Sequence, residues 1–301
     1  MNILIYEQIS PSIIEKIKLL GHEVYDISND RSKETEYLPI CETIIVKSKT
    51  FVNKDLIDKA KKLKYIIKGG VGIDKIDADY AHNLGIHVLN TPDAPIISVA
   101  EYVFGLIICL TRNISQSDLA FKNGETDFEK FKGYELYGKT LGVVGFGRIG
   151  REVAKRALAF GLNVIACDKY LSMSPMPSVK LYPLNQLLAE SDIITFHLTF
   201  DPKKDKPIIE EEHFSMMKDN VFLINCAKNG IINEVALIQA LNRGKIGGIA
   251  IDVLGMDSSL IPLLKNNPKI IATPNLASKT FETDQRISEH IFTIIRGFEQ
   301  K

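Results

Sequence analysis

Three glycines in one short turn are the residues whose spacing says most about chemistry. Gly145, Gly147 and Gly150 follow the apolar run 140–144 and precede a helical pattern at 151–160. In a strand–turn–helix unit the first glycine permits a tight turn, the second lets the backbone approach a pyrophosphate, and the third lets the helix lie close on the sheet. The helix N-terminus adds N–H groups and a partial positive charge for the phosphates. The pattern therefore predicts a dinucleotide-binding turn with contacts from Gly145, Phe146, Gly147, Arg148, Ile149 and Gly150.

An acid follows at the expected place. Asp168 ends the next apolar run, Asn163–Cys167, about as far beyond the glycines as such an acid should lie. Its carboxylate can accept hydrogen bonds from both hydroxyls of a ribose and would repel a 2′-phosphate, which favours NAD over NADP. Lys169, beside it, weakens this preference. The alternative is an ordinary glycine turn in a βαβ unit, and the complete order of strand, glycines, helix, strand and acid disfavours it.

The bulk composition excludes several classes of protein. The chain has 301 residues, of which 45% are hydrophobic, and its formal net charge is zero, so we expect about two domains and neither a nucleic-acid nor a membrane partner. Cys41, Cys109, Cys167 and Cys226 lack the spacing of metal ligands, so we expect no metal, reduced core cysteines and a cytoplasmic location. The run 96–110 is short and contains an acid, which indicates a buried helix and not a membrane span.

The elements around the glycine turn form two alternating strand–helix series. Predicted strands lie at 2–6, 22–25, 43–46, 65–68 and 87–90, and again at 140–144, 163–167, 192–197, 221–225, 248–252 and 270–272. A long helix over 97–115 joins the series, and a last helix over 283–298 returns to the first. This predicts an α/β fold with two Rossmann-like, doubly wound parallel sheets and a cleft between them. We expect a discontinuous, flavodoxin-like substrate-binding domain, 1–91 plus 277–301, and an NAD-binding domain, 92–276.

Several motifs in one order carry a resemblance to a known family. They are Val46-Lys47-Ser48-Lys49-Thr50, the segment 70–77, Asn90-Thr91-Pro92, the segment 98–101, the segment 138–142, Ser191-Asp192 and Ile224-Asn225-Cys226-Ala227. The chain resembles the D-isomer-specific 2-hydroxyacid dehydrogenases over nearly its whole length, and among them the phosphoglycerate dehydrogenases of serine biosynthesis. The resemblance implies NAD as cofactor, a small 2-hydroxy or 2-keto acid as substrate, and a homodimer formed largely through the long helix.

The catalytic set of that family is altered here. The family uses an arginine for the substrate carboxylate, a histidine as general acid/base and a glutamate that pairs with the histidine. The corresponding positions hold Lys228, Asn275 and Asp257. Lysine keeps the charge but loses the planar fork, and aspartate is a shorter carboxylate. A carboxamide at 275 can hydrogen-bond an oxygen but cannot shuttle a proton, a loss typically worth about 10²–10⁴-fold in rate.

The sequence leaves the source of the proton open. Water, Asp257 or Lys279 could supply it, although a solvated lysine at a helix start is the preferred interpretation of Lys279. The resemblance also implies a substrate loop of Gly70, Val71 and Gly72, with further substrate contacts from Lys47 and Ser48, although a lysine-rich surface loop is an equal alternative. The implied remaining cofactor contacts are His197, Leu198, Thr199, Cys226, Ala227 and Asp252. Asp252 would accept from the nicotinamide carboxamide, or else would cap a turn.

Two functions therefore stay open. One is an NAD-dependent dehydrogenase of D-2-hydroxyacids, similar to the phosphoglycerate dehydrogenases, with Lys228, Asp257 and Asn275 as its altered catalytic set. The other is an NAD(H)-binding sensor or regulatory protein that kept the fold and lost the acid.

Overall fold

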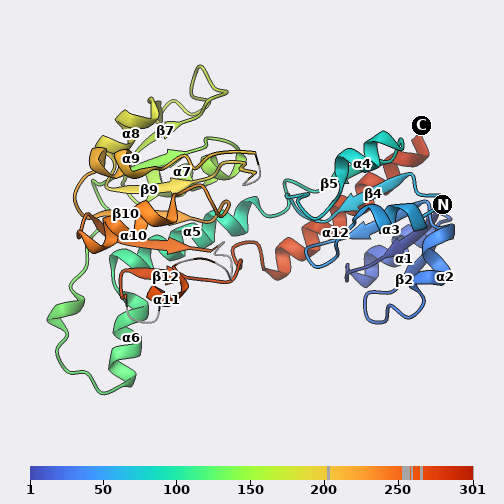
Figure 1. Ribbon diagram of the computed structural model, residues 1–301, viewed down its shortest axis with the longest axis horizontal. Coiled ribbons are helices and arrows are strands. Elements are labelled where there is room, and N and C mark those ends of the chain that lie inside the picture. The colour runs from blue at the N-terminus through green and yellow to red at the C-terminus, as the bar shows by residue number, and fades with distance from the viewer. Residues whose placement is uncertain (202–203, 253–257, 259, 265–266, 301) are drawn as a thin grey trace. The chain divides into compact units, whose positions relative to one another are not determined.

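The chain divides into two compact units in a computed structural model (Figure 1). The structure describes residues 1–201, 204–252, 258, 260–264 and 267–300. Unit 1 comprises Met1–Pro95 and the chain from Lys279 onward, and unit 2 comprises Ile96–Ser278. The sequence analysis set the corresponding boundaries at 91 and 276, a few residues earlier.

Unit 1 contains a parallel sheet with strand order β2-β1-β3-β4-β5. Its strands are β1 (Asn2–Ile5), β2 (Glu23–Asp26), β3 (Thr43–Val46), β4 (Tyr65–Lys68) and β5 (His87–Asn90). Its helices are α1 (Pro11–Leu19), α2 (Glu34–Tyr37), α3 (Lys54–Lys59), α4 (Ala78–Asn83) and α12 (Phe281–Arg296), with 3-10 turns at Leu38–Ile40 and Gly297–Gln300. This flavodoxin-like order places the topological switch point at β1 and β3.

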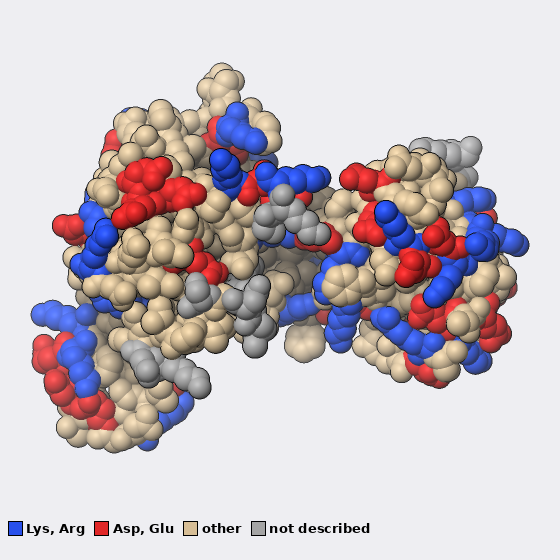
Figure 2. Space-filling model, viewed as in Figure 1, with Lys and Arg blue, Asp and Glu red and all other residues tan. Residues whose placement is uncertain are grey.

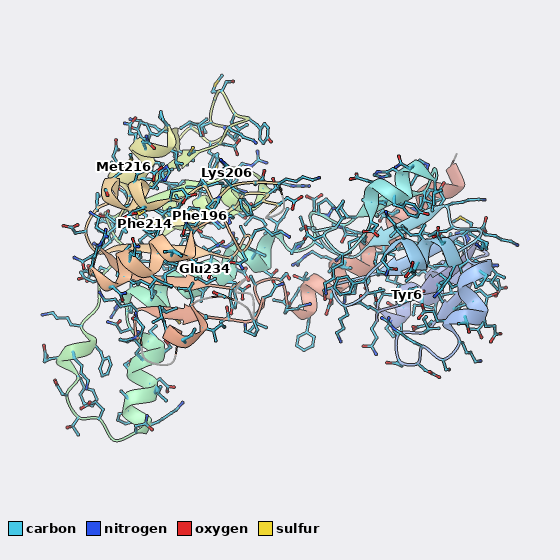
Figure 3. The ribbon with its side chains drawn as sticks, viewed as in Figure 1. Tyr6, Phe196, Lys206, Phe214, Met216 and Glu234 are labelled. Atoms are coloured by element: carbon cyan, nitrogen blue, oxygen red, sulfur yellow. The ribbon has the colours of Figure 1, made fainter. Side chains whose placement is uncertain are left out.

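The period-two pattern of β1 accounts for the two faces of this sheet. Ile3 and Ile5 belong to the core that also contains Ile287, Ile291 and Ile295 of α12. Leu4 belongs to the core on the opposite face, together with Tyr6, which is 1% exposed and is labelled in Figure 3. The C-terminal helix thus covers one face of the N-terminal sheet, as the sequence predicted.

Unit 2 contains a larger parallel sheet with strand order β12-β11-β10-β9-β6-β7-β8. Its strands are β6 (Thr140–Val144), β7 (Asn163–Cys167), β8 (Lys180–Leu181), β9 (Ile193–Phe196), β10 (Val221–Asn225), β11 (Ile246–Ile251) and β12 (Ile270–Ala272). Its helices are α5 (Ile96–Thr111), α6 (Ile114–Lys122), α7 (Arg148–Ala159), α8 (Leu184–Glu190), α9 (Glu211–Met216), α10 (Glu234–Asn242) and α11 (Ile261–Leu264), with a 3-10 turn at Glu129–Phe131. The chain runs outward from β6 in both directions, so the switch point lies between β6 and β9.

Two apolar cores flank this second sheet. Leu141 and Val143 pack with residues of α5 and α7 on one face. Phe196 packs on the other face, with Phe214 of α9, and both side chains are labelled in Figure 3. The predicted α/β class with two doubly wound parallel sheets is confirmed.

The predicted helix over 97–115 is confirmed as far as Thr111 and wrong at its C-terminal end. α5 ends at Thr111, and Asn113 takes a left-handed backbone with φ of 54°. Asparagine tolerates this conformation, which interrupts the helix, and α6 continues at an angle of 59° to α5. Figure 1 shows α6 extending away from the sheet of unit 2. Among the described residues, no single helix is long and apolar enough to cross a membrane, although α5 and α6 taken together pass that test by length and composition.

Charged side chains of both signs are interspersed on the visible surface of each unit, as Figure 2 shows. All four cysteines are free, and Cys41 is buried.

Candidate functional site

The glycine turn between β6 and α7 has the geometry of a phosphate-binding turn. Gly145 has a φ of +92°, and a Cβ on it would lie 2.6 Å from the carbonyl oxygen of His197. A Cβ on Gly150 would lie 2.3 Å from the carbonyl oxygen of Gly145, so helix and turn approach too closely for a side chain. A Cβ on Gly147 would meet no atom of the described chain within 4 Å. The second glycine therefore leaves open space at the N-terminus of α7, where an anion would bind.

Asp168 connects the end of β7 to this turn. Its Oδ2 accepts the backbone N–H of Phe146 at 2.8 Å, and its Oδ1 accepts that of Tyr170 at 2.9 Å. The carboxylate is half-buried, and each of its oxygens has a second lone pair for a ribose hydroxyl. The neighbouring ammonium of Lys169 lies over the Tyr170 ring, 4.8 Å from its centroid.

His197 lies across the switch point from the glycine turn. Its backbone N–H donates to the Val144 carbonyl at 2.8 Å, which joins it to β6. Its Nε2 lies 2.9 Å from Thr195 Oγ1. Burial lowers the pKa of its imidazole to about 3. The ring is therefore neutral at neutral pH.

Asn225, the last residue of β10, orders the segment that carries Lys228. Its Oδ1 accepts the N–H of Ala227 at 3.1 Å, and its Nδ2 donates to the Lys228 carbonyl at 2.9 Å. Lys228 is half-buried.

Burial raises the pKa of the Cys226 thiol well above its usual range, so this group stays protonated.

Asp252 orders the turn that carries Asn275. Its carboxylate is fully buried and accepts the hydroxyl of Thr273 at 2.6 Å and the N–H groups of Leu276 and Ala277 at 2.7 and 2.8 Å. Its backbone carbonyl accepts the N–H of Asn275 at 2.7 Å. These bonds are those of a turn cap, the second of the two interpretations offered by the sequence, and a contact to the nicotinamide carboxamide stays a prediction.

Tyr102 of α5 is a member of this network that the sequence did not indicate. Its phenol hydrogen-bonds the side chain of Thr273, and burial raises its pKa, so it stays protonated. No motif signals the residue, because its partner is far along the chain.

Asp257 lies outside the described residues.

In unit 1 the predicted substrate residues follow β3 and β4. Gly70 has a φ of +121°, and its N–H donates to Thr91 Oγ1 at 2.7 Å. The carbonyl of Val71 accepts from Asn90 Nδ2 at 2.7 Å. Gly70 therefore provides the turn, and substrate contacts from the N–H groups of Val71 and Gly72 stay a prediction.

Glu7, the second residue after β1, holds the neighbouring loop. Its Oε1 accepts the backbone N–H groups of Lys47, Lys49 and Thr50 at 2.9, 3.0 and 3.0 Å, and its Oε2 also accepts that of Lys49 at 3.0 Å. Burial alone would raise the pKa of this carboxyl, but the backbone hydrogen bonds lower it below its usual value. The sequence analysis missed Glu7, although an acid directly after a buried strand was a usable signal.

The structure thus gathers the candidate residues at two sheet edges. The glycine turn, Asp168, the 197–199 segment, Cys226, Ala227 and Asp252 follow the carboxyl ends of strands in unit 2, and Lys47, Ser48 and the 70–72 loop follow those of unit 1. Ligands of doubly wound sheets bind at such edges.

Comparison with known proteins identifies the protein family to which the chain belongs. Residues 104–277 match the model of the "D-isomer specific 2-hydroxyacid dehydrogenase, NAD binding domain". The chain belongs to the D-isomer specific 2-hydroxyacid dehydrogenase family.

Three similar proteins are compared with the chain. D-3-phosphoglycerate dehydrogenase of Methanocaldococcus jannaschii is 38% identical over 99% of this chain and 58% of its own length, so the chain spans little more than half of that relative. Hydroxypyruvate reductase of Thermotoga maritima is 36% identical over 89% of each chain. The crystal structure of D-lactate dehydrogenase from Aquifex aeolicus, complexed with NAD and lactic acid, matches with a TM-score of 0.81 at 28% identity and covers 100% of this chain and 96% of that one.

The Asp252 network makes a testable prediction about the Asn275 turn. In Asp252→Asn one carboxylate oxygen becomes an NH₂ group that cannot accept from Leu276 or Ala277, so we expect a loss of about 1–3 kcal/mol of stability and faster amide exchange at 276 and 277. Thr273→Val removes the hydrogen bonds of its hydroxyl with Asp252 and Tyr102 but leaves both N–H bonds to Asp252, so amide exchange at 276 and 277 should change less. Thermal unfolding and hydrogen exchange by mass spectrometry measure both effects. Unchanged exchange at 276 and 277 in Asp252→Asn would contradict this role.

Proposed function

We propose that this chain is an NAD-dependent oxidoreductase that acts on the CH–OH group of a D-2-hydroxyacid, with a 3-phosphoglycerate-like acid as substrate. The observation that carries the proposal is the open space over Gly147 at the N-terminus of α7, beside Asp168. Family membership supports the hydride chemistry. The names of the M. jannaschii and T. maritima relatives support a three-carbon acid.

The cofactor contacts in this proposal all lie in unit 2. The glycine turn and the first amides of α7 hold the pyrophosphate, and Asp168 accepts from the ribose, which selects NAD. The remaining contacts are His197, Leu198, Thr199, Cys226, Ala227 and Asp252. When bound, the nicotinamide supplies the hydride donor or acceptor.

The chain's own residues then bind the acid and its reacting oxygen. Lys228 holds the carboxylate as a point charge, an interaction worth about 1.5–3 kcal/mol for a charge-assisted hydrogen bond. The amides of Val71 and Gly72 also bind carboxylate oxygens, and Lys47 and Ser48 contact the remainder of the substrate. Asn275 donates to the oxygen on C2, and water supplies the proton that a carboxamide cannot deliver. Asp257 remains the residue predicted to occupy the position of the family's glutamate.

The assembly proposed with this function is a homodimer through the α5–α6 region. Leu119 and Phe121 of α6 are 61% and 70% exposed, and Phe128 in the following segment is 57% exposed. Apolar side chains gathered on a projecting segment are typical of an interface. The free cysteines support a reducing compartment such as the cytoplasm.

The glycine turn can be tested separately from the fold. In Gly147→Ala the added methyl meets no described atom, so thermal stability should be unchanged, but the methyl enters the proposed phosphate space. We expect the Kd for NADH to rise about tenfold or more, which corresponds to about 1.4 kcal/mol. NADH fluorescence measures this well because the chain has no tryptophan. Gly150→Ala, whose Cβ would lie 2.3 Å from a backbone oxygen, should lose stability as well. Unaltered NADH affinity in Gly147→Ala argues against the cofactor placement.

The altered catalytic set predicts that histidine at position 275 increases turnover. Asn275 has a φ of 58°, a conformation that histidine also tolerates, so Asn275→His should fold. A positioned acid/base group should raise the rate of NADH oxidation by 2-oxo acids, up to about 10²–10⁴-fold. Absorbance with a panel that includes 3-phosphohydroxypyruvate measures it.

Asn220→His is the matched control, since Asn220 has a φ of 60° and lies outside the candidate site. NADH binding without oxidation at any pH, in both the wild type and Asn275→His, would exclude the dehydrogenase and favour the sensor.

The dimer predicts a mass near twice the 33.6 kDa of one chain. Phe121→Asp places a charge in the proposed interface and should shift the mass toward that of one chain, as measured by light scattering after size-exclusion chromatography. Leu19→Asp changes a residue that is 86% exposed in unit 1 and should leave the mass unchanged. A wild-type protein that stays monomeric at micromolar concentration would contradict the dimer.

A further inference from the structure

The chain passes between the two units twice. We call these places the first connection, between Pro95 and Ile96, and the second connection, between Ser278 and Lys279. The first connection leads directly into α5 of unit 2, and the second leads, two residues later, into α12 of unit 1. Because the connections join the units covalently, any movement of one unit relative to the other requires backbone rotation at or near both of them.

Apolar packing holds a residue close to each connection. Ala94 is fully buried in the core of unit 1 that contains Ile287 of α12. Ala277 is 4% exposed and belongs to the core of unit 2 that contains Ala100 and Val103 of α5. The chain therefore leaves a packed core just before each connection, and neither of these alanines can shift without disturbing that packing.

The guanidinium of Arg286, on α12, reaches both connections on the unit 1 side. Its Nε donates to the Ala94 carbonyl at 2.8 Å, and its Nη2 donates to Thr283 Oγ1 at 3.2 Å. Thr280 Oγ1 donates to the same Thr283 oxygen at 3.0 Å and accepts the Thr283 N–H at 3.1 Å. Thr280 is the N-cap of α12, and it lies directly after Lys279 of the second connection. One side chain thus ties together the unit 1 ends of both connections.

A second network does the same within unit 2. Tyr102 of α5, the helix that follows the first connection, hydrogen-bonds Thr273, and the Thr273 hydroxyl donates to Asp252. The Asp252 carboxylate accepts the N–H groups of Leu276 and Ala277, which precede the second connection. Each unit therefore holds its own ends of the two connections through side-chain hydrogen bonds.

We propose that Arg286 is a positioning residue that makes the unit 1 ends of the two connections move as one piece, so that relative movement of the units is confined to the connections themselves. A guanidinium suits this role because its N–H groups point in fixed, different directions, so one group can donate to two separate acceptors. Domains commonly move about a few residues at the ends of elements. The inference does not depend on the proposed function, since it rests on contacts within each unit.

Amide hydrogen exchange of the full chain, resolved to single residues, tests the role of Arg286. The Ala94 N–H donates to the Thr91 carbonyl at 3.4 Å beside the first connection, and the Asp284 N–H donates to the Thr280 carbonyl at 3.1 Å beside the second. In Arg286→Met both amides should exchange about tenfold faster or more, because a hydrogen bond from a charged donor is lost on each side.

The amides at 276 and 277 provide the internal comparison. Asp252 holds them in unit 2, so they should keep their wild-type exchange rates in Arg286→Met. Arg296→Met is the matched control, because it removes an arginine of the same helix whose guanidinium lies over the Phe292 ring, 5.9 Å from its centroid. This variant should exchange as the wild type does.

Two further variants separate the bridge from the positive charge. Arg286→Lys keeps the charge, but its single nitrogen cannot occupy the positions of both Nε and Nη2, so it should restore slow exchange beside one connection at most. Thr283→Val removes the acceptor on the side of the second connection and leaves the bond to Ala94. Exchange should then become faster at 284 and stay unchanged at 94.

A distance measurement provides a readout that a purely local contact would not change. Leu19 of unit 1 and Met173 of unit 2 are 86% and 79% exposed. Spin labels attached to p-acetylphenylalanine at these two positions avoid the native cysteines, and dilution with unlabelled protein removes distances between chains. Double electron–electron resonance should give a broader distance distribution in Arg286→Met than in the wild type, and an unchanged one in Arg296→Met.

Each result decides the role of Arg286. The coupling is overturned by faster exchange beside one connection only in Arg286→Met, by full recovery in Arg286→Lys, or by an unchanged distance distribution. Faster exchange at 276 and 277 while the core strands keep their rates also overturns it. If Arg286→Met destabilises the whole protein, so that the core strands exchange faster as well, Thr283→Val decides: a broader distance distribution supports the coupling, and an unchanged one overturns it.

Discussion

Buried side-chain oxygens that accept backbone N–H groups fix the loops on which both candidate sites depend. A buried carboxylate is unfavourable unless its oxygens are hydrogen-bonded, so a loop that satisfies one cannot move without exposing an unpaired charge. Glu7 holds the 47–50 loop of unit 1 in this way, and Asp252 holds the 275–277 turn of unit 2. Asp168 does the same on a smaller scale for Phe146. Each of these acids lies at the carboxyl end of a parallel strand, where neighbouring loops converge.

This arrangement explains how the backbone at positions 228 and 275 is held independently of the side chains there. Asp252 and Asn225 hold the segments around positions 275 and 228 through backbone groups, which do not depend on the side chains displayed there. Asn275 has a left-handed backbone, which asparagine adopts more readily than most residues. The backbone of this turn therefore suits the asparagine that it carries.

The sequence was most informative where short-range pattern decides the structure. β3, β4, β10 and β12 match their predicted bounds because each is a continuous apolar or β-branched run between turn residues. The glycine turn could be predicted because the backbone at these positions leaves no room for a side chain. The close approaches of backbone atoms to Gly145 and Gly150 show this.

Features that depend on distant partners could not be predicted in this way. The break at Asn113 has no glycine or proline to mark it in the sequence, and β8 is only two residues long. The contacts of Lys279 with Ser48 and of Tyr102 with Thr273 join segments far apart in the chain. A lysine before a helix and a tyrosine on a buried helix carry no local signal of such partners.

The titration properties of the two units differ, and this bears on which groups respond to pH. Near the proposed cofactor site, burial lowers the pKa of His197 and raises those of Cys226 and Tyr102, so all three groups stay neutral around pH 7. In unit 1, burial places the pKa of Lys68 at about 8, close to the working range. A relative with a catalytic histidine would report that histidine in its pH profile. In the proposed function Asn275 stands at the family's histidine position and His197 stays neutral, so we expect the pH dependence to arise at groups such as Lys68 and not in a histidine proton-transfer step.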